Sequence, residues 1–145
     1  MARVSTYLNF RRDTETALNF YRELFGGELI GPVLRFGDAP ACDGSPLPEA
    51  DRELIMHMEV SILGGHVLMG TDSPEAMAMP FVAGNNVHLN LEPDTRAEAE
   101  RLYTALTDGG SIQMPLQDMF WGGYFASFTD RYGTHWMINC AQPAA

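Results

Sequence analysis

The sequence predicts an α+β fold in which two βαβββ modules form a curved mixed sheet around a cavity. Two segments of helical periodicity carry apolar residues at matching spacing, and a glycine pair ends each of them. Each segment follows one β-like run and precedes three more. A solenoid needs at least three units, so a repeat of this length indicates a duplication.

The first module is expected over residues 1–72. Its helix begins at Asp13, has acidic character in its first turn and ends at Gly26-Gly27. A tight hairpin is expected at Gly64-Gly65. The apolar face of the helix consists of Ala17, Phe20, Tyr21 and Leu24. The expected strands are Val4 to Phe10, Glu28 to Phe36, Glu53 to Leu63 and His66 to Thr71.

The second module is expected over residues 86–141. Thr95 to Glu98 forms a capping-box pattern before a helix that ends at Gly109-Gly110. A turn is expected at residues 130–133. Apolar residues recur along the helix at the same spacing as in the first one, at Ala99, Leu102, Tyr103 and Leu106. The expected strands are Val87 to Glu92, Ser111 to Gln117, Gly123 to Thr129 and Thr134 to Cys140.

Two segments do not fit this scheme. Residues 38–52 are rich in proline and acidic residues, which predicts a surface excursion. Residues 73–85 join the modules, and Met77, Met79 and Phe81 give this segment an apolar character suited to covering a pocket or a partner chain.

Size and charge set broad limits on function. The 145 residues fit a single domain, and no apolar stretch is long enough to cross a bilayer. A formal charge of −10 disfavours both nucleic acid and anionic membrane surfaces as partners. The N-terminus lacks the pattern of a secretory signal, and Cys42 and Cys140 are expected to be reduced thiols. We therefore expect a cytoplasmic protein.

Several motifs carry a family resemblance over nearly the whole chain. Residues 120–125 (FWGGYF), 130–133 (DRYG) and 136–139 (WMIN) resemble the C-terminal signature of PhnB-like proteins. These proteins belong to the vicinal oxygen chelate superfamily, which includes glyoxalases, bleomycin resistance proteins and dioxygenases. Residues 7–10, 17–21, 56–58 and 70–72 match as well. The resemblance implies paired modules around a ligand cavity, usually in a homodimer.

Metal-dependent members of that superfamily place His, Glu or similar ligands on inward-facing strands. Here the corresponding positions fall near Thr6, Met69, Asn86 and Met137, and such side chains bind transition metals poorly. No cofactor is therefore expected. His57 and Glu59, which share a strand face, could form an alternative site with His88. Elemental analysis distinguishes the two hypotheses.

Strand alternation selects the residues that face the cavity. If Val87, Leu89 and Leu91 pack against the helix, then Asn86, His88 and Asn90 point to the concave side. In the last strand Trp136 is expected in the core. An aromatic wall is expected from Phe120, Trp121, Tyr124 and Phe125 around Gly122-Gly123. Asp72 and Asp130 are expected to cap turns.

The leading hypothesis is a metal-free protein that binds a small, partly apolar molecule. The residues predicted to bind it are Asn9, His57, His88, Asn90, Trp121 and Tyr124. The alternatives are a metal-dependent lyase or dioxygenase of the glyoxalase type and a demethylubiquinone methyltransferase-like protein. The sequence shows no Gly-x-Ser-x-Gly elbow and no glycine-rich nucleotide loop, so it does not decide whether a reaction is catalysed.

Overall fold

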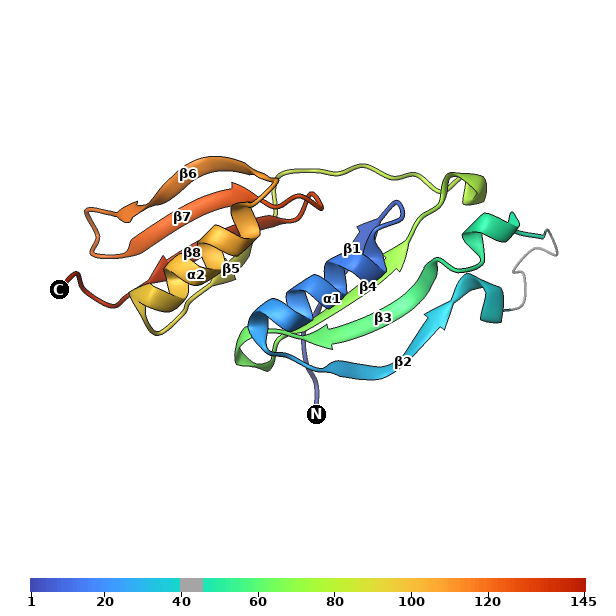
Figure 1. Cartoon of the computed structure of the whole chain (residues 1–145), viewed down its shortest axis with the longest axis horizontal. Coiled ribbons are helices and arrows are strands. Elements are labelled where there is room, and N and C mark those ends of the chain that lie inside the picture. Colours follow the sequence, from blue (N-terminus) through green and yellow to red (C-terminus); the bar gives the residue numbers. More distant parts are fainter. Residues whose placement is uncertain (40–45) are drawn as a thin grey trace. The chain divides into compact units, whose positions relative to one another are not determined.

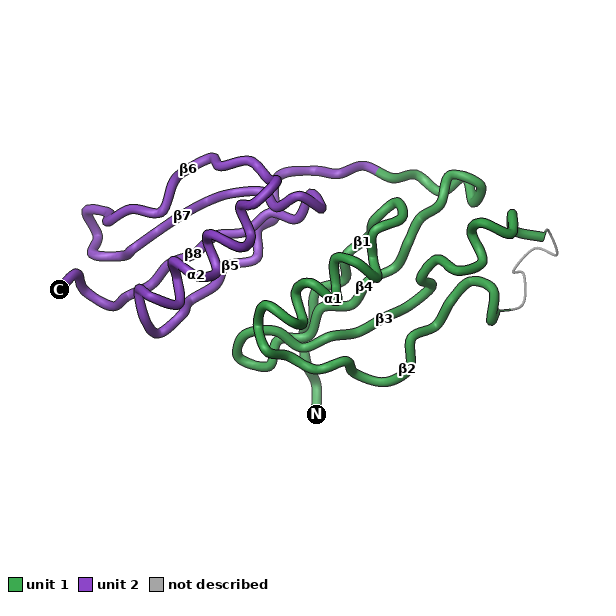
Figure 2. The backbone as a smooth tube through the Cα atoms, in the orientation of Figure 1, with its two compact units in different colours: residues 1–81 green, residues 82–145 purple. Residues whose placement is uncertain are grey.

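The computed structural model describes residues 1–39 and 46–145. Cys42 therefore lies outside the described residues. The chain divides into two compact units, Met1–Phe81 and Val82–Ala145 (Figure 2). Each unit contains one helix packed on one four-stranded sheet, so the predicted α+β fold of two βαβββ modules is confirmed.

The first unit has the sheet order β1-β4-β3-β2 (Figure 1). β1 pairs with β4 in parallel, and the other neighbours are antiparallel. Gly64 and Gly65 adopt positive φ between β3 and β4, as the predicted hairpin requires. The elements are β1 (Thr6–Phe10), α1 (Thr14–Phe25), β2 (Leu29–Arg35), β3 (Ile55–Ser61) and β4 (Val67–Asp72).

Helix α1 is fixed at its N-terminus by a residue from the end of β4. The Thr14 backbone N–H donates to Asp72 Oδ1 at 3.0 Å, and the Ile55 N–H donates to Asp72 Oδ2 at 2.8 Å. Asp13 precedes the helix but makes no side-chain capping bond. The predicted side-chain to backbone hydrogen bonds of Asp72 are present, but its buried carboxylate joins the start of α1 to β3 and does not cap a turn.

The second unit repeats the arrangement with the sheet order β5-β8-β7-β6. Trp136 of β8 is fully buried, as predicted, and so is Ile138. Asp130 accepts bonds from the Tyr132 and Thr134 N–H groups and from Trp136 Nε1, which confirms its role in the turn. The elements are β5 (Leu89–Leu91), α2 (Arg96–Thr107), β6 (Ser111–Asp118), β7 (Tyr124–Thr129) and β8 (His135–Cys140).

The two helices bury slightly different residues from those predicted. In α1 Leu18 is fully buried, whereas Phe20 and Leu24 are only partly covered. Thr95 caps α2 by accepting a bond from the Glu98 N–H at 3.2 Å. The second bond of a capping box, from the Thr95 backbone N–H to the Glu98 side chain, is not made. The Glu98 carboxylate pairs with Arg101 instead.

The described parts of the two irregular segments contain no strand, as predicted, and residues 40–45 of the first segment lie outside the described residues. Short 3-10 turns lie at Phe36–Asp38 and Glu49–Asp51 in the first segment and at Glu75–Met77 in the second. Met79 is exposed, and Phe81 stacks under the guanidinium of Arg11 at 4.6 Å. In the described part of the chain no helix combines the length and the apolar composition needed to span a membrane.

Candidate functional site

Each sheet has one face that its helix covers and one that the helix leaves free. In the first unit Met58, Val60 and Leu68 are buried, and Gly70 lies directly under Thr14 and Leu18 of α1. Side chains alternate along a strand, so their neighbours point the other way. We call this second surface the free face of the first sheet, defined by Tyr7, Asn9, His57, Glu59, Met69 and Thr71.

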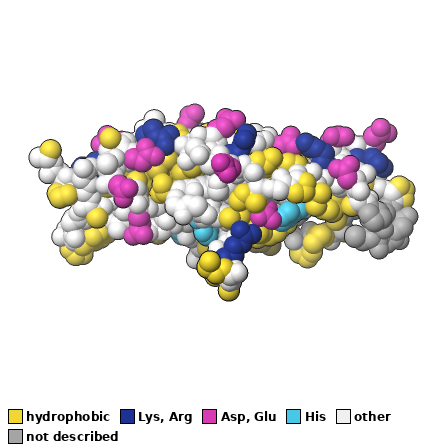
Figure 3. Space-filling view, turned by 90° about the horizontal axis from the view of Figure 1, so that it is seen from below, with side chains coloured by type: hydrophobic (Ala, Val, Ile, Leu, Met, Phe, Trp, Pro, Cys, Tyr) yellow, Lys and Arg dark blue, Asp and Glu magenta, His cyan; other side chains and the backbone are white. Residues whose placement is uncertain are grey.

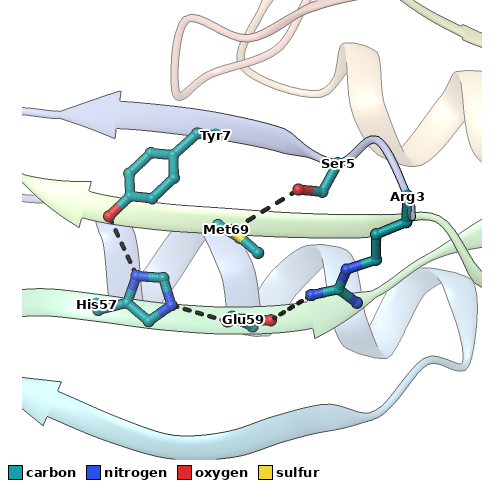
Figure 4. Close-up of polar contacts among 6 residues, drawn as sticks. All are labelled: Arg3, Ser5, Tyr7, His57, Glu59 and Met69. Atoms are coloured by element: carbon teal, nitrogen blue, oxygen red, sulfur yellow. Dashed lines mark hydrogen bonds and ion pairs between the residues drawn. The ribbon is translucent and has the colours of Figure 1, made fainter. Parts of the chain in front are cut away.

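A chain of polar contacts crosses the free face of the first sheet (Figure 4). Tyr7 Oη lies 3.1 Å from His57 Nδ1, and His57 Nε2 lies 2.9 Å from Glu59 Oε1. The other Glu59 oxygen is 3.5 Å from the guanidinium of Arg3. Figure 4 shows these side chains in front of the sheet, with the helix behind it. The prediction that His57 and Glu59 share a face is confirmed.

The electrostatics of this chain keep Glu59 ionised and Tyr7 protonated. The hydrogen bond from His57 lowers the pKa of the Glu59 carboxyl, and the charge of Arg3 acts in the same direction. Partial burial raises the pKa of the Tyr7 hydroxyl, and the negative charge of Glu59 adds to this rise. A hydrogen bond with Thr71 offsets part of the rise in Tyr7.

The polar chain lies among apolar side chains. Glu59 is in register with Met69 on β4 and with Ile30 on β2, and His57 is in register with Leu34. Asn9 lies on β1 opposite Thr71 and is exposed. Figure 3 shows histidine, acidic and basic side chains at the surface beside hydrophobic ones. Such a surface suits a ligand with one polar group on an apolar body.

The free face of the second sheet carries two predicted residues near a third that was not predicted. Asn90 is in register with Met137 of β8 and is exposed. The rings of His88 and His135 lie 5.4 Å apart. His135 bonds Thr129 Oγ1 at 2.8 Å and the Gly84 carbonyl at 2.7 Å. His135 was not predicted as a site residue, because its bonding partners lie 6 and 51 positions away in the chain and no local pattern indicates them.

Val87 does not extend the apolar face of β5. It is 70% exposed and precedes the strand, which begins at Leu89. The prediction of a continuous apolar face over Val87, Leu89 and Leu91 is therefore wrong at its first residue. Parallel pairing with β8 reaches only Leu89 to Leu91.

The aromatic wall divides between the two faces of the sheet. Trp121 packs edge-on against Phe120 and Phe125, with ring centroids 5.2 and 5.7 Å apart. Beside them the buried Oδ1 of Asn139 has no hydrogen-bond partner among the described residues. A Cβ at Gly123 would lie 2.4 Å from this oxygen, so glycine is required for the close approach.

Tyr124 lies on the opposite face from these aromatic residues. Its hydroxyl donates to Glu100 Oε1 at 3.2 Å, and Arg96 stacks on its ring at 3.7 Å, so its contacts are with α2. Tyr124 pairs with Cys140, whereas Phe125 pairs with Asn139 on the free face. The structure therefore does not bring Tyr124 together with Trp121 and Asn90.

Two of the four positions matched to metal ligands, Thr6 and Met69, lie on opposite faces of the first sheet. Thr6 is in register with Leu68, and its neighbour Tyr7 is in register with Met69. Thr6 Oγ1 contacts His66 Nε2 at 2.8 Å instead. Asn86 precedes β5. Across residues 1–39 and 46–145, no group of three or more His, Cys, Asp or Glu residues is arranged to hold a metal ion.

Comparisons with known proteins agree with this architecture. The family model described as Glyoxalase/Bleomycin resistance protein/Dioxygenase superfamily matches residues 3–138. The solved structure of protein PA1353 from Pseudomonas aeruginosa has 38% sequence identity and a TM-score of 0.82, and the match covers 98% of this chain and 99% of that one.

Two further relatives are more distant. A proposed 3-demethylubiquinone-9 3-methyltransferase, the PhnB protein from Bacillus cereus, has 24% identity and a TM-score of 0.78, with coverage of 97% of this chain and 100% of that one. Protein YjdN from Escherichia coli K12 is 28% identical over 94% of this chain and 93% of its own length. The PhnB protein is a structural neighbour, which supports the predicted PhnB-like resemblance.

Proposed function

The chain belongs to the Glyoxalase/Bleomycin resistance protein/Dioxygenase superfamily, and from this membership we propose that it binds a small, partly apolar molecule without a metal ion. Asn9 and His57 contribute from the free face of the first sheet. His88, Asn90 and Trp121 lie on the second unit and stay predictions from the sequence. Tyr124 is left out of this proposal because its contacts are with α2.

The contact chain from Tyr7 through His57 to Glu59 is the observation that carries the proposal. These side chains are only partly exposed, at 29% for His57 and 21% for Glu59. Polar groups held in fixed geometry on an otherwise apolar surface lose little entropy when a ligand docks.

Thermal-shift screening against small metabolites and antibiotics tests this proposal. A compound that binds the native state raises the melting temperature, and at one hundred times its Kd the stabilisation is about 2.7 kcal/mol. The His57→Asn variant should lose the shift. His66→Asn is the matched control, since His66 contacts Thr6 rather than the free face. If every compound fails on the wild-type protein, or if both variants respond equally, the proposal is wrong.

The alternative is a metal-dependent lyase or dioxygenase. The contact of His57 with Glu59 would supply two ligands of such a site, and His88, the third ligand predicted from the sequence, lies on the second unit. Elemental analysis of the purified protein decides between them. We expect no stoichiometric transition metal, whereas about one Zn, Ni or Fe per chain would favour the enzyme.

We also propose a cytoplasmic homodimer. The family resemblance and the apolar character of Met77, Met79 and Phe81 support this assembly, because an exposed apolar side chain such as that of Met79 gains by being covered. Sedimentation equilibrium at micromolar concentration should give the mass of two chains. A monomer under those conditions would remove the dimer from the proposal and leave the ligand site unaffected.

A further inference from the structure

We propose that the ligand bound at the free face of the first sheet carries a neutral hydroxyl group that donates a hydrogen bond to the Tyr7 oxygen. This inference rests on the proposed function and deepens it by naming the ligand class. The class comprises small phenols, enols and alcohols with an apolar body. With a neutral imidazole on His57, the contacts of Tyr7, His57 and Glu59 set the direction of the hydrogen bonds between them.

The first step concerns the proton between His57 and Glu59. A carboxylate has no hydrogen to donate and accepts only. At 2.9 Å from Glu59 Oε1, His57 Nε2 must therefore carry the hydrogen. Arg3 holds the second carboxylate oxygen from the other side, which keeps Glu59 in place as an acceptor.

The second step concerns the hydrogen between His57 and Tyr7. A neutral imidazole with its hydrogen on Nε2 has a lone pair on Nδ1, so it accepts there. At 3.1 Å the Tyr7 hydroxyl must then donate to Nδ1. Its only hydrogen points along the sheet, toward His57. The Tyr7 oxygen consequently faces a ligand as an acceptor.

The third step concerns the remaining capacity of the Tyr7 oxygen. A phenolic oxygen accepts as well as donates, and Thr71 takes up part of this capacity. The Thr71 hydroxyl also lies within 3.4 Å of the Ile55 carbonyl and 3.3 Å of the Asp72 carbonyl, which compete for its hydrogen. Tyr7 itself is 47% exposed, so a ligand can reach it.

The surroundings select a neutral, partly apolar donor. The ionised Glu59 on the same face and the formal charge of −10 disfavour an anionic ligand. Met69, Ile30 and Leu34 lie in register with the polar chain and offer contact to an aromatic or aliphatic body. A carbonyl or ether oxygen would meet the Tyr7 oxygen with no hydrogen between them.

The test compares two probes that differ in a single donor, para-fluorophenol and its methyl ether para-fluoroanisole. Fluorine NMR titration at about pH 8, where a histidine is ordinarily neutral, gives both dissociation constants. We expect the wild-type protein to bind the phenol about fivefold more tightly, which is the equivalent of ~1 kcal/mol for one hydrogen bond. The Tyr7→Phe variant should bind both probes equally.

Two further variants test whether the preference depends on the direction in which the Tyr7 hydroxyl donates its hydrogen, and not only on the presence of a hydroxyl. In His57→Leu the Tyr7 hydroxyl is free to rotate and donate outward, so the preference should fall toward unity while Tyr7 remains. Tyr103→Phe removes a hydroxyl from α2 and should keep the wild-type ratio. Circular dichroism checks that each variant is folded.

Three outcomes would overturn the inference. They are equal binding of both probes by the wild-type protein, tighter binding of the ether, and no binding of either probe up to about 10 mM. The proposed function is judged separately, by the His57-dependent shift in the compound screen. A protein that passes that screen but shows no preference between the probes binds a ligand of another class.

Discussion

At the residue scale, Asp72 is the polar side chain on which the first unit most depends. Its buried carboxylate accepts bonds from the Thr14 and Ile55 backbone N–H groups. We expect Asp72→Ala to lower the free energy of unfolding by about 3 kcal/mol, since two buried donors lose a charged acceptor. Urea denaturation measures this change.

Asp13→Ala is the matched control for that experiment. Asp13 stands directly before α1 but makes no capping bond, so its replacement should cost less than about 1 kcal/mol. If the two alanine variants lose equal stability, Asp72 is not the cap that the geometry indicates.

Glu59 should make stability depend on pH. Because His57 lowers its folded-state pKa below the ordinary value of 4.5, ionised Glu59 stabilises the fold at pH values above 4.5. This contribution is lost as the pH falls through the folded-state pKa. The stability difference between wild type and Glu59→Gln should thus be largest near neutral pH and vanish in acid. A difference that stays constant from about pH 7 to about pH 3 would contradict the assignment.

The sequence could predict which face of a strand a residue lies on, but it could not predict the residue's hydrogen-bond partners on other strands. The spacing of His57 and Glu59 within one strand was enough to place them together. Tyr7 was missed because it lies 50 residues from His57 in the chain, and the contact exists only through the parallel pairing of β1 with β4. No local pattern encodes that register.

At the element scale, helix α1 packs closely against β4 at Gly70. A Cβ at Gly70 would lie 2.7 Å from Thr14 Cγ2 and 2.9 Å from Leu18 Cδ1. We expect Gly70→Ala to displace the helix and to cost about 1–3 kcal/mol of unfolding free energy. Gly84→Ala is the control, because its Cβ would meet only Asn86 Oδ1 at an ordinary 3.7 Å. Equal stability of the two variants would show that α1 does not approach the sheet so closely.

The order and type of the elements could be predicted, because the spacing of apolar residues and the glycines that end helices and form turns are local signals in the sequence. The ends of the elements were harder to predict, and Val87 shows why. Its apolar side chain continues the alternation of Leu89 and Leu91, yet β8 offers no partner beyond Leu89. Tyr124 shows why an aromatic cluster in space could not be predicted from aromatic residues that are adjacent in the sequence. Adjacent aromatic residues in a strand point to opposite faces, so a cluster in sequence is divided in space.

At the scale of the whole molecule, both units assign different roles to the two faces of their sheets. In each, the helix buries one face of the sheet, while histidine and asparagine side chains lie on the other. Alternation within strands made this division predictable from the sequence. The bonding that gives the free face its chemistry depends on pairings between distant strands, which only the structure supplies.

The central claim is that ligands bind the free face of the first sheet. Backbone amide chemical shifts, mapped by NMR during titration with a stabilising compound from the screen, test it most directly. The account predicts the largest changes at Tyr7, His57 and Met69, with those of α1 unchanged. The account would be contradicted by chemical-shift changes concentrated on α1, on α2 or on the hairpin at Phe120 and Trp121, with no change at β1, β3 and β4.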